Sequence, residues 1–330
     1  MDRPPASPHD PPPGGTGAEG PQSPSSLAAL VLGAWRDPRG RVALAGWSAC
    51  LCLLAAAFWP TLRQFAYVWA TDDNYSHGFL VPLISLYFAN EAARLGPVAV
   101  RSGVLAGVAL LGLALAGRLA TIVVPVGIVA DGSFLLGLAG VVALMAGADA
   151  LRQHGFALGF LVFMIPLPVA LYATIASPLQ LLVSRVAEVV LNASDIPVLR
   201  EGNLLTLPGD VRMFVAEACS GMRQLTGFLA LTTAVAYLAR RPAWHRGVLV
   251  ASAIPVAMTA NAIRVTMTGY LMSYDPRFGV GTFHTVEGLL MMGFGLAMLG
   301  AECWALNRLA DLVVEAEPPP PSPPPTGGAR

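Results

Sequence analysis

Long apolar stretches are the feature that most restricts how this chain can fold. A helix needs about 20 consecutive apolar residues to cross the hydrocarbon core of a bilayer, and about eight stretches of this kind are present. They cover approximately 42–59, 77–93, 102–117, 121–148, 155–173, 222–239, 247–271 and 285–305. Only 12% of the residues are charged, against about 25% in ordinary soluble domains. The sequence therefore predicts an all-α membrane protein, a transmembrane bundle of about eight spans.

The arginines predict which loops face the cytoplasm. The chain has no lysine, so its 20 basic residues are all arginine. Three groups of them lie beside expected spans: Arg36, Arg39 and Arg41; Arg94 and Arg101; Arg240, Arg241 and Arg246. By the positive-inside rule these loops are cytoplasmic. With about eight spans, we expect a multi-pass protein of the plasma (inner) membrane with both termini in the cytoplasm and residues 174–221 outside.

Both ends of the chain are too polar and too rich in proline to form a packed core. Residues 1–26 are rich in Pro, Gly and Ser, and the C-terminal end contains the run PPPPSPPP. Because such segments cannot offset their conformational entropy by burial, we expect them to be disordered. The first tail is also too long and polar for the start of a signal peptide, so we expect it to stay uncleaved. The predicted organisation is a tail over 1–40, a membrane domain over 41–306 and a Pro-rich tail over 307–330.

The expected outer segment has two parts of different periodicity. Residues 177–195 place leucines and valines at helical spacing, with Arg185 and Glu188 on one side, which predicts an amphipathic helix at the outer interface. The residues that follow alternate apolar and polar side chains around Pro208 and Gly209, which predicts a short hairpin outside the membrane. That hairpin leads directly to Cys219.

Composition excludes several classes of chemistry. Without lysine, the chain has no lysine general base or Schiff base, so it is not a serine-lysine protease. The four cysteines show neither a disulfide framework nor a metal-ligand spacing, and Cys50 and Cys52 would point to different faces of a helix. The net charge of zero argues against a nucleic-acid partner. We expect no cofactor and no metal.

Cys219 is the first candidate for chemistry. It lies in VAEACSGMRQL, just before the sixth expected span. The positive end of a helix dipole favours the thiolate form, and Arg223 lies one turn further on the same face. Glu217 adds a second charge beside it. A lone cysteine would more simply be a buried structural thiol, but this charged neighbourhood favours a reactive one.

Arg264 is the second candidate, because it lies inside an apolar run. It is about seven residues, or roughly 10 Å, from the outer end of its expected span. A guanidinium at that depth needs a partner or a polar cavity, whereas the simpler alternative is that it snorkels to the interface. Asn261, one turn earlier on nearly the same face, is a candidate to hold Arg264 in place.

His284 is the third candidate, at the start of the last expected span. Glu287 follows three residues later on the same face and is placed to orient the imidazole. A single histidine at an interface is usually just solvated, so its interest depends on its neighbours. A thiolate attacks carbonyls, an imidazole moves protons and a guanidinium stabilises an oxyanion. Cys219, Arg264 and His284 together therefore suit acyl transfer through a thioester, if they converge.

Several separated motifs resemble the exosortase/archaeosortase family of membrane cysteine transpeptidases over roughly residues 40 to 306. The motifs are DDNYSHGFLVPLIS at 72–85, IPLPVALY at 165–172, IPVLREGN at 196–203, EACSGMRQL at 217–225, NAIR at 261–264 and HTVEG at 284–288. The resemblance implies a bundle of about eight helices in which Cys219 is the nucleophile and Arg264 and His284 are its essential partners.

The resemblance also implies the substrates and partners. Members act at the membrane on exported proteins that carry a C-terminal sorting signal: a short motif such as Pro-Glu-Pro, a transmembrane helix and a basic tail. The enzyme cuts near the motif and passes the new carboxyl end to a cell-surface acceptor. We favour His284 for proton transfer and Arg264 for charge stabilisation.

Two further polar positions call for an interpretation. His77, in the segment YSHG, could contact substrate or could cap a helix with Ser76, and we favour a structural or substrate-binding role over catalysis. Asp131 and Gly132 predict a short outer break in the fourth expected span.

Two other functions remain open from the sequence. The first is a transporter or an assembly factor for exported polysaccharide, with Arg264 binding an anionic group. Transporters often contain paired repeats with broken helices, and the chain shows no convincing internal repeat. The second is an inactive scaffold, in which Cys219 would be inert to thiol reagents applied from outside.

Overall fold

The fold is almost entirely helical and divides into two compact units. The computed structural model describes residues 26–96, 103–215, 222–239, 241–279 and 281–316, with the backbone alone for 281–285 and 311–316. Unit 1 contains Met1–Ala57, Ile84–Ala116 and Leu135–Gly159; unit 2 contains Phe58–Leu83, Gly117–Phe134 and Phe160–Arg330. The division falls within α4 (Leu80–Ala93), α5 (Val104–Val123) and α6 (Gly127–Ala146), and before the last residue of α8 (Gly155–Phe160).

Unit 1 is a group of packed helices held by a few specific contacts. Besides its parts of α4, α5 and α6, it contains α1 (Leu27–Arg36), α2 (Pro38–Ala57), α7 (Ala148–Gln153) and most of α8 (Gly155–Phe160). The Asn90 side chain accepts a 2.9 Å hydrogen bond from the Leu27 backbone N–H, and the Gln153 amide donates to the Ala92 carbonyl at 2.6 Å. These bonds fix α1 and α7 against the end of α4.

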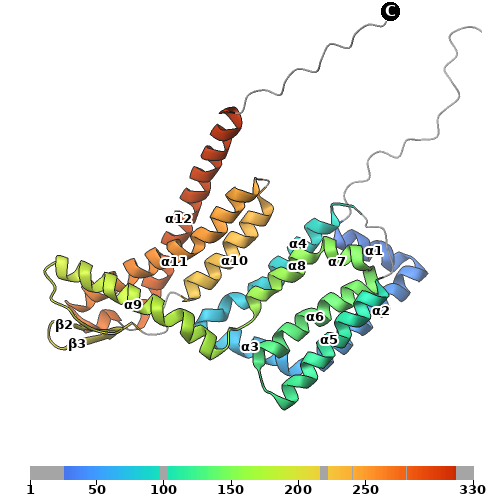
Figure 1. The fold of residues 1–330 in the computed structure, drawn as a ribbon, viewed down its shortest axis with the longest axis horizontal. Coiled ribbons are helices and arrows are strands. Elements are labelled where there is room, and N and C mark those ends of the chain that lie inside the picture. Colours follow the sequence, from blue (N-terminus) through green and yellow to red (C-terminus); the bar gives the residue numbers. More distant parts are fainter. Residues whose placement is uncertain (1–25, 97–102, 216–221, 240, 280, 317–330) are drawn as a thin grey trace, which may run out of the picture. The chain divides into compact units, whose positions relative to one another are not determined.

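Unit 2 holds most of the candidate residues. Its elements are α3 (Trp59–Thr71), η1 (Asp73–Phe79), η2 (Leu161–Met164), α9 (Val169–Ala193), β1 (Leu199–Glu201), β2 (Leu204–Leu207), β3 (Val211–Phe214), α10 (Met222–Leu238), α11 (Ala243–Met272), η4 (Pro276–Gly279) and α12 (Gly281–Ala316) (Figure 1). Helix α11 contacts α9, α10, α12 and η4, so it is the central element of this unit.

Six helices among the described residues are long and apolar enough to cross a membrane: α2, α5, α6, α9, α11 and most of α12. The predicted class of multi-pass helical membrane protein is therefore confirmed, but the predicted count of about eight spans is not. Helices α4 and α10 match two of the expected spans in position, yet contain only 14 and 17 residues.

Two details of the predicted spans are wrong. The stretch 155–173 is not one helix, because α8 and η2 end before Pro166 and α9 begins only after Pro168, where the ring nitrogens offer no N–H to a helical ladder. The expected break at Asp131 is also absent, since α6 continues through it. The expected interfacial helix at 177–195 is the second half of α9, which is itself long enough to span a membrane.

The predicted hairpin is present as part of a three-stranded antiparallel sheet in the order β1-β2-β3. Strands β2 and β3 pair with Leu207 opposite Val211, around a turn in which Gly209 and Asp210 have positive φ angles of 79° and 59°. Strand β1 pairs with β2 through a second turn at Gly202, with φ of 66°. The alternation seen in the sequence therefore encodes two turns rather than one.

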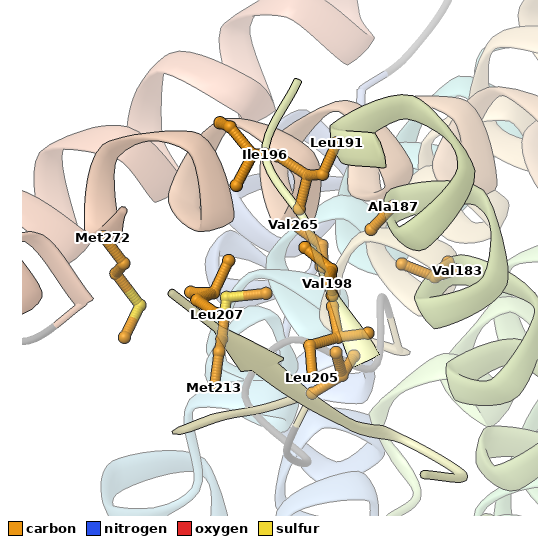
Figure 2. Packing of buried hydrophobic residues seen from close by; sticks show 11 residues of the cluster. Val183, Ala187, Leu191, Ile196, Val198, Leu205, Leu207, Met213, Val265 and Met272 are labelled. Carbon is orange, nitrogen blue, oxygen red and sulfur yellow. The ribbon is translucent and has the colours of Figure 1, made fainter. Parts of the chain in front are cut away.

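The sheet is joined to α9 and α11 by an apolar core. Figure 2 shows Leu205, Leu207 and Met213 of the strands together with side chains from both helices. The cluster contains Val183, Ala187, Leu191, Ile196, Val198, Leu205, Leu207, Met213, Val215, Val265 and Met272. Gly269 allows the close approach, because a Cβ there would lie 2.8 Å from Leu191 Cδ1. This core fixes the end of α11 that follows Arg264.

Candidate active site

A polar cluster joins the last turns of α11 to the start of α12, two otherwise apolar helices. The Thr268 hydroxyl lies 2.8 and 2.7 Å from the two carboxylate oxygens of Glu287 and donates its single proton to this carboxylate. The charge of Arg264 acts on the same carboxylate. Thr268 and Glu287 are each 4% exposed, so this is a buried charged contact between two helices.

Helical spacing and one glycine explain how this cluster forms. Arg264 and Thr268 are four residues apart and therefore share a face of α11, where the Thr268 hydroxyl is also 3.0 Å from the Arg264 carbonyl oxygen. On α12, Gly288 follows Glu287 and leaves room for the guanidinium, whose Nη2 would lie 3.4 Å from a Cβ at that position. A buried carboxylate is costly without a charged or hydrogen-bonding partner, and α11 supplies both.

The sequence suggested that Glu287 orients His284, one turn earlier on α12. The structure shows that the Glu287 carboxylate accepts from Thr268. His284 lies in the first turn of α12, and its side chain is outside the described residues, so its contact with Glu287 stays a prediction. Three residues of helix, or roughly 5 Å of rise, separate the two positions along α12.

Asn261 lies on the same stripe of α11, one turn before Arg264, and is 1% exposed. Its burial agrees with a role inside the bundle. The predicted contact between the Asn261 amide and the Arg264 guanidinium stays a prediction.

A second charged contact lies at the start of α10. Arg223 is in the first turn of α10, and its Nη2 is 2.6 Å from Oδ2 of Asp73 in η1. The sequence suggested that Arg223 would act on Cys219; the structure pairs it with an acidic residue that we had not selected. Cys219 and Glu217 lie outside the described residues, which resume at Met222.

The segment that presents Asp73 is anchored at several points. The backbone N–H of Leu167 donates a 3.1 Å hydrogen bond to the Tyr75 hydroxyl, so the motif IPLP is joined directly to η1. The Trp69 indole N–H donates to the Met164 carbonyl at 3.0 Å, and the same ring lies where a Cβ on Gly78 would be. Two motifs far apart in the sequence thus form one local structure.

Burial changes the proton affinity of two residues in η1. Desolvation raises the pKa of Tyr75 above its ordinary value, only partly opposed by the bond from Leu167. Desolvation lowers the pKa of His77 below its ordinary value, against hydrogen bonds to the backbone of Phe163 and Asn74. His77 is therefore neutral near pH 7. Its half-buried, backbone-bonded position favours the structural side of the two roles suggested above.

Sequence reasoning missed three residues of these contacts: Asp73, Tyr75 and Thr268. Thr268 was detectable, since it lies four residues after Arg264 on the same face. The sequence offered a weaker indication for Asp73, which forms an acidic pair with Asp72 just before an apolar stretch. Nothing in the sequence paired either one with its partner. Within the described ranges, no three His, Cys, Asp or Glu side chains come together in a way that could hold a metal ion.

These features define a multi-pass helical membrane protein that has a buried polar contact between α11 and α12 and a small sheet packed against α9 and α11. A family model described as a transmembrane exosortase matches residues 69–301, which is more than half of the chain. The chain therefore belongs to the transmembrane exosortase family, and the resemblance drawn from its motifs is confirmed. Comparisons with curated proteins and with solved structures found no match. Membership in this family implies a membrane protease or transpeptidase that processes sorting signals.

Proposed function

We propose that this protein is an integral-membrane cysteine protease and transpeptidase. It cleaves the C-terminal sorting signal of exported proteins through a thioester on Cys219 and transfers the new carboxyl end to a cell-surface acceptor. The observation that carries the proposal is the position of the Arg264 guanidinium against Gly288, next to Glu287, which brings the arginine of α11 beside the part of α12 that follows His284. The motif with Cys219, the whole of α11 and the part of α12 that carries His284 and Glu287 lie within the matched residues 69–301.

The proposed first half-reaction forms the thioester. The Cys219 thiolate attacks the scissile carbonyl carbon, and the carbonyl electron pair moves to oxygen. Arg264 stabilises the oxyanion, and the negative charge of Glu287 helps to keep the guanidinium in place. When the carbonyl reforms, the C–N bond breaks and His284 gives its proton to the leaving amine. The products are an acyl-thioester and the released sorting signal.

The second half-reaction returns the enzyme to its starting state. An acceptor nucleophile gives its proton to His284 and attacks the thioester carbonyl. The C–S bond then breaks, which restores the thiolate and the imidazolium. The arginine-rich loops support an arrangement with both termini in the cytoplasm and this site toward the outside. In it, the membrane domain over 41–306 is flanked by the tails over 1–40 and 307–330.

The test uses a secreted reporter that carries a C-terminal Pro-Glu-Pro motif, an apolar helix and an arginine tail. The reporter is co-expressed with the protein, and its shortening is followed over time. Cys219→Ala should abolish processing while the protein still inserts in the membrane. Cys219→Ser should also fail, because a hydroxyl is almost entirely un-ionised near neutral pH. Cys303→Ala, which removes a thiol within α12, is the matched control and should process normally. Retained processing by Cys219→Ala would refute the proposal.

A further inference from the structure

The contact between Asp73 and Arg223 joins two parts of the chain that are far apart in sequence. Asp73 is the first residue of η1, and Arg223 is the second residue of α10. Their charged groups are 2.6 Å apart, a short distance for a charge-assisted hydrogen bond. Because Arg223 lies in the first turn of α10, this ion pair links the start of the helix to η1.

The acidic partner is presented by a rigid segment. The Asp72 carboxylate accepts hydrogen bonds from the backbone and side chain of Asn74 at 2.9 and 3.0 Å, which closes the first turn of η1. Tyr75 bonds to the Leu167 backbone, and the Trp69 ring covers Gly78. The position of the Asp73 backbone is therefore set by contacts on both sides, independently of Arg223.

This ion pair contributes little to the stability of the fold. The Asp73 side chain is 82% exposed and the Arg223 side chain 37% exposed, and ion pairs open to solvent are weak. Helix α10 is held mainly by apolar packing against α11 and α12, in a cluster that includes Phe228, Ala253 and Leu299. Because the pair is weak and η1 is already held by other contacts, we infer that the pair orients the Arg223 side chain rather than stabilises the fold.

We propose that Asp73 is a positioning residue. It holds the Arg223 guanidinium, and therefore a positive charge, in one place at the start of α10. The inference rests on the function proposed above, in which the nucleophile precedes α10 by a few residues. Arg223 held at this helix end keeps a positive charge where it favours a thiolate, and Asp73 stops the guanidinium from swinging into solvent. Asp73 itself touches no reacting atom.

The test compares reporter processing with thermal unfolding of the detergent-solubilised protein. Asp73→Asn and Arg223→Gln should each slow processing by about 10- to 100-fold, the range expected when a reacting group is misplaced by about 1 Å. Their unfolding temperatures should stay close to that of the wild type. The matched control is Asp210→Asn, which removes the acid of another exposed ion pair, 3.7 Å from Arg212, and should change neither quantity.

Rescue separates positioning from a merely structural role. Asp73→Glu should recover part of the rate, and the double variant Asp73→Arg with Arg223→Asp should process faster than either of its single changes. The combination of Asp73→Asn with Arg223→Gln should be no slower than Arg223→Gln alone. Normal processing by Asp73→Asn, multiplied losses in the double variant, or a loss of rate matched by a loss of stability would each overturn the inference.

The outcome for Cys219→Ala distinguishes the two proposals. If Cys219→Ala still processes the reporter, the proposed function fails, and Asp73 has no nucleophile to position. If Cys219→Ala is inactive while Asp73→Asn is normal, only the inference about Asp73 fails.

Discussion

Helix α11 presents two adjacent stripes that are held in opposite ways. One stripe, with Val265, Gly269 and Met272, packs against α9 and the sheet, where only apolar atoms meet (Figure 2). The other, with Arg264 and Thr268, meets a buried carboxylate on α12. The first contact depends on shape, and the second depends on charge and hydrogen bonding.

The difference shows how a single helix can be both anchored and reactive. Apolar packing is tolerant of small changes but cannot hold a guanidinium at one angle. The polar stripe orients charged groups, but each of them is costly if its partner is lost. The apolar stripe fixes the position of α11 against the sheet, and with it the backbone of Arg264. The polar stripe then orients the Arg264 side chain.

The largest effect should come from removing the acid of the polar stripe. Glu287→Ala removes the buried carboxylate that accepts from the Thr268 hydroxyl and takes away the negative charge that interacts with Arg264. Breaking one side of a buried ion pair costs about 3–5 kcal/mol, and the partial exposure of Arg264 places this case near the lower end. Glu287→Gln keeps a hydrogen-bond acceptor for Thr268 and should lose less. Unfolding in detergent measures both variants; equal losses would mean that the hydrogen bond from Thr268 contributes nothing and that the charge accounts for the whole effect.

The next largest effect should come from Arg264→Lys, which should slow reporter processing and leave the stability of the fold nearly unchanged. Lysine keeps the charge but lacks the planar fork that donates two bonds at once. If Arg264 stabilises an oxyanion, its loss should slow reporter processing by about 100- to 1000-fold. The same substitution tests the transporter hypothesis, under which a site that needs only positive charge would keep partial function.

The shape-dependent stripe should respond to an added side chain. Gly269→Val would bring a branched side chain against Leu191 and Met213, whose nearest atoms lie 2.8 and 3.3 Å from a Cβ at that position. Overpacking of this kind costs about 1–3 kcal/mol. Gly293→Val on α12 is the control, because a Cβ there meets nothing within 4 Å. Similar unfolding temperatures for the two variants would show that α9, α11 and the sheet are not closely packed.

The two stripes also differ in how far the sequence predicts them. Apolar periodicity predicted α11 over 247–271, close to its observed bounds of Ala243–Met272. Alternation around Pro208 and Gly209 predicted strands at the sheet. Hydropathy failed at 155–173, because an apolar average does not register the missing N–H groups of Pro166 and Pro168. Composition and period therefore predict elements well, except where proline interrupts them.

Partners were harder to predict than faces. The sequence indicated that Arg264 needs a partner and placed Glu287 near the start of the last span, but it did not predict that Thr268 donates to Glu287. Helical period shows which residues share a face, not which helix lies opposite. The contacts of Thr268 with Glu287 and of Asp73 with Arg223 depend on which elements pack side by side, and the sequence pattern does not show this.

The smallest effect should be a pH dependence from His77, outside both stripes. Burial holds the pKa of His77 below its ordinary value of 6.5, so the imidazole is neutral in the folded and unfolded states above that pH. As pH falls below 6.5, the unfolded chain takes up a proton before the folded one does. Stability should therefore decrease between pH 6.5 and the lower pKa of the folded state, and remain constant below it as far as this group is concerned. Unfolding temperatures at about pH 7.5 and about pH 5 should differ more for the wild type than for His77→Gln, which does not titrate. An identical pH response in the two proteins would mean that His77 is as exposed as an ordinary surface histidine.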